Sequence, residues 1–288
     1  MARTITISSS GGTLVMGAAS GIRARLNVRG LGMSPVDLQT FESAADGARI
    51  TGRRTLPRTI DMPIKITGVD RAQVEARFDL LSQVVTPDLA DGSTKITVTL
   101  DGVGWFVYGE RSGGGDPTYG EDTDGTTFVM LVLTFQCDPF WSREDQDSKI
   151  IVPGGLGRGL LRGVGSLSGL EVSSASALGV ATFANTGSLP AFPTWRLTAP
   201  FTGFTLTSEA GEVLNWVGTK ATGQIIIDTQ FATIVDELGV NQYGGLSGAP
   251  RFWKIPRGSS DGSVVVADAI GGSTKIEVFW RPRKSVLF

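Results

Sequence analysis

Apolar and polar residues alternate with a period of two along several segments of the first half of the chain, which is typical of strands with one buried face. The alternation is clearest in Ile60, Met62, Ile64 and Ile66 and in Ile96, Val98 and Leu100. It predicts strands over 4–7, 13–16, 22–28, 59–67, 95–100, 103–108 and 127–136. The dipeptide Asp101-Gly102 fits a two-residue turn with positive φ, so 95–108 is predicted to be a hairpin.

One segment follows a helical period instead. Asp70 can cap a helix, and Gln73 stands three residues later, as in a capping box. Apolar residues then recur at helical spacing until Pro87, namely Val74, Phe78, Leu81 and Val85. We predict one amphipathic helix over about 70–86 that packs its apolar side across the open face of the sheet.

The second half of the chain contains short predicted strands spaced about ten residues apart, with Gly and Pro between them. They cover 180–184, 194–198, 203–207, 213–217, 224–228, 233–235, 251–255, 263–267 and 274–280. Such spacing is typical of a β-sandwich or jelly roll.

The chain is therefore predicted to be mainly β, with two domains. Residues 1–150 form a β domain of split-barrel or sandwich type that carries the helix, and residues 177–288 form the sandwich. Between them, 151–176 is a linker rich in Gly, Leu and Ser. Its glycines at 154–159 lack the flanking strand, helix and lysine of a phosphate-binding loop.

Two long segments without periodicity, 37–58 and 111–124, are predicted to be loops, either for binding or as simple connections. The first carries the basic residues Arg49, Arg53, Arg54 and Arg58, and the second carries the acidic residues Asp116, Glu121, Asp122 and Asp124. For the arginines, a solvated loop or a subunit contact is favoured over phosphate binding. Opposite charges could meet across neighbouring copies, so both groups are candidate interface residues.

Composition excludes several functions. The 288 residues include no histidine, the commonest general base and zinc ligand, and only one cysteine, Cys137, which fits a core and cannot form an intrachain disulfide. The net charge of −2 gives no footprint for nucleic acid or an anionic membrane. No secretory signal or bilayer-spanning run is visible. We expect a protein that is soluble on synthesis, binds no cofactor and is not an enzyme.

The segment Cys137-Asp138-Pro139-Phe140-Trp141 resembles the Asp-Pro-Phe-Trp junction of the distal tail proteins of long, non-contractile-tailed phages. Upstream, Asp46-Gly47, Gly52-Arg53-Arg54 and Arg58-Thr59-Ile60 are similar to the N-terminal domain of that family. Downstream, Asn185-Thr186-Gly187, Ile227-Asp228-Thr229 and Ile255-Pro256-Arg257-Gly258 are similar to its C-terminal sandwich. The order and spacing agree along nearly the whole chain.

The resemblance implies a structural virion protein of the tail tip, made in the cytoplasm of the bacterial host. In the family, N-terminal domains form a ring, reportedly a hexamer, which meets the tail tube protein on one face and the tail hub or baseplate protein on the other. A galectin-like or carbohydrate-module-like C-terminal domain lies outside the ring. A host-surface saccharide is a further candidate partner, whereas nucleic-acid specificity and membrane insertion are not expected.

The residues of the junction also have a physical interpretation. Pro139 cannot donate to a sheet, so the strand ends there, and Phe140 and Trp141 add large apolar area directly after it. These two rings are either an anchor between domains or subunits or ordinary core residues, and the sequence leaves both possibilities open.

Two rival functions follow from side-chain chemistry. A carbohydrate-binding module could stack sugars on Trp195, Trp216, Tyr243, Trp253 and Trp280, although a sandwich core uses the same residues and is favoured. A glycosidase needs two carboxylates at a defined separation, one of them desolvated, which a solvated acidic loop does not offer. That loop could also offer oxygen ligands to a cation, but it lacks the rest of an EF-hand motif, so the sequence leaves a cation there open and no metal site is predicted.

Overall fold

The computed structural model describes residues 3–42, 47–86, 93–118, 120–151, 176–267 and 273–287, with only the backbone for 176–179. The chain divides into two compact units, Met1–Asp145 with Lys284–Phe288, and Gln146–Arg283. This division differs from the predicted one because β11 (Asp147–Ile151) pairs with a strand of the second unit and the last residues return to the first. Most of the predicted linker, residues 152–175, lies outside the described residues.

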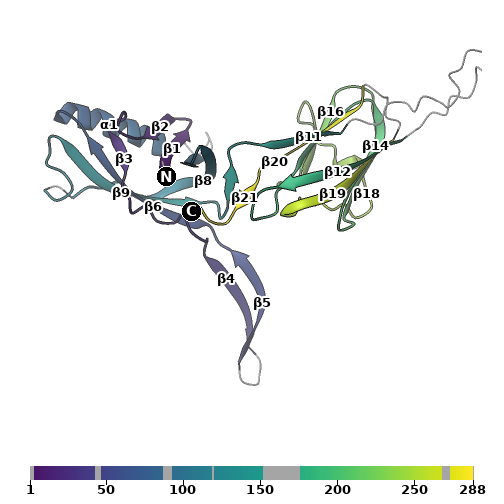
Figure 1. Cartoon of the computed structure of the whole chain (residues 1–288), viewed down its shortest axis with the longest axis horizontal. Coiled ribbons are helices and arrows are strands. Elements are labelled where there is room, and N and C mark those ends of the chain that lie inside the picture. Colours follow the sequence, from purple (N-terminus) through teal and green to yellow (C-terminus); the bar gives the residue numbers. More distant parts are fainter. Residues whose placement is uncertain are drawn as a thin grey trace, which may run out of the picture. The chain divides into compact units, whose positions relative to one another are not determined.

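The first unit is built on a nine-stranded sheet of order β2-β1-β7-β8-β9-β6-β3, with β10 paired to β8 and β21 paired to β10 (Figure 1). The two edge strands, β2 and β3, contact each other, so the sheet is nearly closed like a barrel. The predicted β domain is thus confirmed. Its strands are β1 (Arg3–Ser9), β2 (Gly12–Met16), β3 (Ile22–Ala24), β6 (Arg58–Thr67), β7 (Thr94–Leu100), β8 (Val103–Gly114), β9 (Phe128–Cys137), β10 (Trp141–Arg143) and β21 (Arg283–Lys284).

The hairpin predicted around Asp101-Gly102 is confirmed. Strands β7 and β8 pair in antiparallel register from Thr94↔Gly109 to Leu100↔Val103, and the two turn residues have φ of 48° and 84°. A turn with two residues at positive φ matches the twist of the strands it joins, which is why this dipeptide fixes the register.

The predicted helix is α1 (Arg71–Val85), and its start follows the sequence signals. The Asp70 carboxylate accepts a hydrogen bond from Gln73 N at 2.8 Å, and the Gln73 side chain accepts one from Val69 N at 3.0 Å. The inner side of α1 packs on the core through Val74, Leu81, Val84 and Val85. Phe78 is only partly buried, so the predicted apolar stripe is not covered along its whole length.

The second unit is a sandwich of two five-stranded sheets, of order β11-β20-β13-β16-β17 and β12-β19-β14-β15-β18. Their inner faces share one apolar core, in which Trp195, Trp253 and Phe183 contact one another edge to face. The predicted sandwich is confirmed. Its remaining strands are β12 (Ser176–Asn185), β13 (Thr194–Thr198), β14 (Phe201–Ser208), β15 (Val213–Lys220), β16 (Gln224–Asp228), β17 (Thr233–Asp236), β18 (Leu246–Ser247), β19 (Gly258–Ala267) and β20 (Lys275–Trp280), and a short 3-10 helix, η2 (Tyr243–Gly245), precedes β18.

Two sequence predictions about strands and loops are wrong, and the strand predicted over 22–28 ends at Ala24. Residues 251–255 do not form a strand, because only Ile255 pairs there, in an isolated bridge with Ala191. The predicted loop 37–58 is instead a β-hairpin formed by β4 (Val36–Glu42) and β5 (Ala48–Thr55). Neither of its faces is buried, so its sequence lacks the clean alternation that identified the other strands.

Candidate interaction surfaces of the first unit

The hairpin of β4 and β5 is a separate two-stranded sheet that projects from the first unit (Figure 1). Every residue of β4 and most residues of β5 are exposed. A two-stranded hairpin is at best marginally stable alone in water, and apolar side chains normally need a cover. The large exposed apolar side chains here are Val36, Leu38, Phe41 and Ile50, with exposed fractions of 46, 49, 66 and 60%.

The register of the hairpin combines apolar and basic side chains on both faces. Phe41 lies directly opposite Arg49, and Leu38 lies directly opposite Arg53 on the other face. Three of the four predicted arginines are therefore exposed; Arg49 and Arg53 lie opposite apolar residues, and Arg54 lies opposite Asp37. Such a mixture of aromatic, aliphatic and arginine side chains is typical of protein interfaces.

Arg58 has a different place from the other three arginines. It is 1% exposed, and its guanidinium donates hydrogen bonds to backbone carbonyls of the same unit. The guanidinium carbon also lies 5.0 Å from the centre of the Trp141 ring. Grouping Arg58 with the exposed arginines is therefore wrong, because it is an internal structural cation. The accepting carbonyls are those of Gly30, Gly32, Pro139 and Ser285, at 3.2, 3.2, 3.2 and 2.9 Å.

Burial also shifts the ionisation of Arg58 and of the neighbouring thiol. Removal from water lowers the pKa of Arg58 to about 10, and the nearby Cys137 opposes this shift. For Cys137, burial raises the pKa to about 12, so the thiol is neutral at physiological pH. Cys137 is the small core residue that its sequence position predicted.

The Asp138-Pro139-Phe140-Trp141 junction forms a corner between two strands that pair with the same neighbour. β9 pairs with the second half of β8 and β10 pairs with its first half, and Asp138 N donates to Tyr108 O at 2.8 Å between them. Trp141 is fully buried in the core of the first unit, and Phe140 is half-buried. Trp141 is therefore a core residue of this unit, which is one of the two interpretations that the sequence left open.

The acidic residues lie on the segment between β8 and β9, residues 115–127, which we call the acidic loop. Asp116, Glu121 and Asp124 are exposed, and Asp122 accepts a hydrogen bond from Thr118 N at 2.8 Å. The loop lies along β9, because Met130 N donates to Asp122 O at 2.7 Å. The predicted loop 111–124 is thus shorter than expected, since β8 continues to Gly114.

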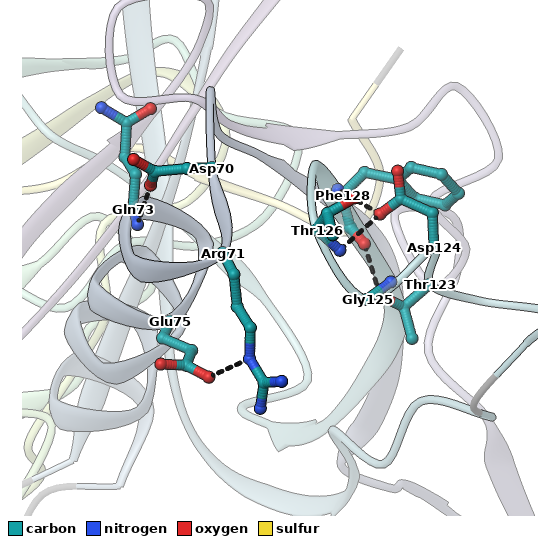
Figure 2. A network of polar contacts seen from close by, with 9 residues as sticks. All are labelled: Asp70, Arg71, Gln73, Glu75, Thr123, Asp124, Gly125, Thr126 and Phe128. Atoms are coloured by element: carbon teal, nitrogen blue, oxygen red, sulfur yellow. Dashed lines mark hydrogen bonds and ion pairs between the residues drawn. The ribbon is translucent and has the colours of Figure 1, made fainter.

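Asp124 organises the end of the acidic loop beside the start of α1 (Figure 2). Its carboxylate accepts hydrogen bonds from the Thr127 hydroxyl and from Thr126 N and Phe128 N, at 2.9 and 3.1 Å for the last two. These bonds, the Thr127 hydroxyl first, hold the pKa of Asp124 well below its usual range. Gly68 N donates to Thr127 O at 2.8 Å, so this turn is tied to the segment that enters α1.

This geometry argues against Asp124 as a catalytic acid. A glycosidase acid needs a raised pKa, whereas the pKa of Asp124 moves downward. Within the described residues, there is also no group of three or more His, Cys, Asp or Glu side chains arranged to hold a metal ion.

A surface groove lies between the second half of α1 and strands β8 and β9. We call it the helix groove, and its volume is about 100 Å³. It opens where Phe78 is incompletely covered, and the sequence did not predict it because strands and helix come together there only in the fold. The residues that define it are Phe78, Leu81, Val85, Arg111, Leu131 and Leu133.

The aromatic residues that motivated a sugar-binding interpretation belong to the sandwich core. Trp195, Trp216, Trp253 and Trp280 are at most 5% exposed, and only Tyr243 of that group reaches the surface, at 39%. The prediction that these tryptophans form the core is confirmed. None of the four can stack on a sugar without unfolding the sandwich.

The fold and these surfaces define a β-rich protein with a nearly closed sheet, a projecting hairpin and a sandwich. No helix within the described ranges is long and apolar enough to cross a membrane. No family model and no curated protein matches the sequence.

Solved structures, however, match the whole architecture. SPP1 Dit, described as a paradigm of the hub adsorption apparatus in phages that infect Gram-positive bacteria, aligns with a TM-score of 0.65 at 16% identity, over 97% of this chain and 98% of that one. A chain of the phage P2 baseplate in its activated conformation with Ca aligns with a TM-score of 0.52 at 11% identity, over 97 and 98%. The resemblance to distal tail proteins is therefore confirmed at the level of the fold.

Proposed function

We propose that this chain is a structural component of a phage tail tip, and that its copies assemble into a ring through the first unit. The observation that carries the proposal is the hairpin, whose apolar and basic side chains are exposed in a single copy. Support comes from the fold, which is shared over almost the full length with SPP1 Dit and a phage P2 baseplate chain.

A closed ring of more than two copies needs two different, complementary surfaces on each copy. The hairpin is one candidate surface. The acidic loop is a candidate for the other, because its charges are opposite to those of Arg49, Arg53 and Arg54. In this proposal the ring joins the tail tube protein to the hub or baseplate protein, and the second unit, the sandwich, lies outside the ring.

The mass of the purified protein in solution tests the ring directly. Light scattering across a concentration series should give one discrete multiple of the 30.3 kDa chain mass, and six copies is the number expected. A mass of one chain at all concentrations would overturn the ring. Co-sedimentation with isolated tail tubes then tests the proposed partner, with the heat-unfolded protein as the control.

A further inference from the structure

We infer that the helix groove is the seat for the hairpin of a neighbouring copy, with Phe41 in the groove and Arg49 against the acidic loop. The inference rests on the proposed ring and adds the residues that make its contact. It follows from three properties of the two surfaces, which are their apolar character, their charge and their positions on the unit.

Apolar character is the first property. Phe41 is 66% exposed and lies near the end of β4, so it is far from the nine-stranded sheet of its own copy. The walls of the groove combine the apolar side chains already listed with the polar residues Ser82, Thr86 and Arg111, and Phe78 is partly uncovered at the surface. Its volume of about 100 Å³ is about two thirds of the roughly 150 Å³ of an apolar cavity that takes up benzene, so the groove would hold part of the Phe41 ring without enclosing it.

Charge is the second property. The acidic loop begins at Gly115, which also lines the groove, and Asp116 follows it directly. At its other end the loop is bonded to Met130, which precedes the groove residue Leu131. Asp116 and Asp122 therefore lie on a segment that borders the groove, whereas Arg111 contributes one cation to its wall. The side chain directly across the hairpin from Phe41 is the cation Arg49, so a ring and a positive charge approach together.

Position is the third property. In Figure 1 the hairpin projects away from the unit on the side opposite to α1, so a hairpin cannot bend back into its own groove. If the hairpin occupies such a groove, the contact therefore joins different copies. Because the two surfaces differ, it is head-to-tail, which is the kind of contact that closes rings.

Cross-linking in the full-length chain tests the contact. We would combine Phe41→Cys with Ser82→Cys, because Ser82 is exposed and lines the groove, and treat the protein with a short bis-maleimide. A ladder of covalent oligomers is expected. The natural Cys137 is buried, and wild-type protein under the same treatment controls for it. Phe41→Cys with Val103→Cys, whose site is 39% exposed but away from the groove, should give no ladder.

Substitution of the ring provides a second measurement. Phe41→Ala should weaken assembly by roughly 30-fold or more, as expected for an aromatic side chain buried at the centre of an interface. Leu26→Ala, which removes a fully exposed apolar side chain elsewhere in the first unit, should leave assembly unchanged. Wild-type rings with neither a ladder nor an effect of Phe41→Ala would overturn this inference and leave the ring intact. A monomeric wild type would overturn both.

Discussion

At the residue scale, Arg58 connects segments that are far apart in the sequence, through hydrogen bonds to carbonyls near residues 30, 139 and 285. Removing it leaves buried carbonyls without donors, at about 1–3 kcal/mol each. We expect Arg58→Ala to lower the free energy of unfolding by about 3 kcal/mol or more in a urea titration. Arg53→Ala, at an exposed site, should change it by less than about 0.5 kcal/mol. Equal stability of both variants would contradict the structural role.

The buried thiol of Cys137 gives a pH-dependent prediction. Its folded pKa of about 12 lies above the ordinary value of 9.0, so the folded state holds the proton that the unfolded state releases. Stability should therefore fall as the pH rises above 9, whereas Cys137→Ala should lose that slope. Urea titrations of both proteins between pH 8 and 10 measure it; Arg58, with a pKa of about 10, begins to titrate in this range in both, so the difference between the two proteins isolates the thiol. A thiol that reacts with Ellman's reagent in the native protein at pH 8 would show that the group is not buried.

The arginines show what residue type can and cannot predict. Arg49, Arg53, Arg54 and Arg58 were one basic group in the sequence, yet three are exposed and one is among the most buried side chains of the chain. What separates them is the position of hydrogen-bond partners that lie 26 to 227 residues away, the most distant being Ser285 O. A buried arginine is recognisable only when its acceptors are known, because its charge normally favours the surface.

At the scale of secondary structure, elements with local signals were predicted and elements without them were missed. The cap at Asp70 and the turn at Asp101-Gly102 are bonded within a few residues, so sequence alone identified α1 and the β7–β8 hairpin. The sequence predicts a loop over β4 and β5, although Val36 and Leu38 do alternate with Asp37 and Gln39 before the polar Thr40 ends the alternation. That weak alternation was the available signal, and mixed exposure on both faces obscured it.

The helix gives a paired prediction that separates folding from assembly. Leu81 is 2% exposed, so Leu81→Ala should cost about 3 kcal/mol of unfolding free energy. Phe78 is partly buried and lines the helix groove, so Phe78→Ala should cost only about 1–2 kcal/mol but weaken assembly more than Leu81→Ala does. Urea titration and light scattering of both variants measure the two effects. A larger loss of stability for Phe78→Ala would mean that its ring serves the core alone.

At the scale of the whole molecule, periodicity was sufficient for the fold class but not for the division of the chain. Strand spacing predicted the sandwich, since each short strand carries its own alternation. The boundary near residue 150 could not be read in this way. β11 is assigned to the second unit by its pairing with β20, and Leu287 is held in the first by a hydrogen bond from its N to Leu31 O at 3.0 Å. Both contacts are long-range and leave no local pattern.

Assembly provides the last prediction. Arg53 and Arg54 are consecutive exposed residues of β5, near the root of the hairpin, and reversing both to glutamate should repel the acidic loop of a neighbouring copy. We expect Arg53→Glu/Arg54→Glu to slow or prevent ring formation while the sandwich and the nearly closed sheet stay folded, as judged by sedimentation and circular dichroism. The matched control is Arg251→Glu/Arg257→Glu, which makes the same change of charge at exposed sites of the second unit.

Salt then distinguishes charge from apolar contact. At an ionic strength of about 1 M the Debye length falls to roughly 3 Å, so exposed pairs are screened while buried apolar contacts remain. The wild-type ring should therefore weaken only partly in high salt, and the charge-reversed variant should recover part of its assembly because the repulsion is screened as well. If the variant sediments as the wild-type ring at both salt concentrations, the arginines do not set the register. The contact then rests on the apolar residues of the hairpin, with Phe41 the first of them to test.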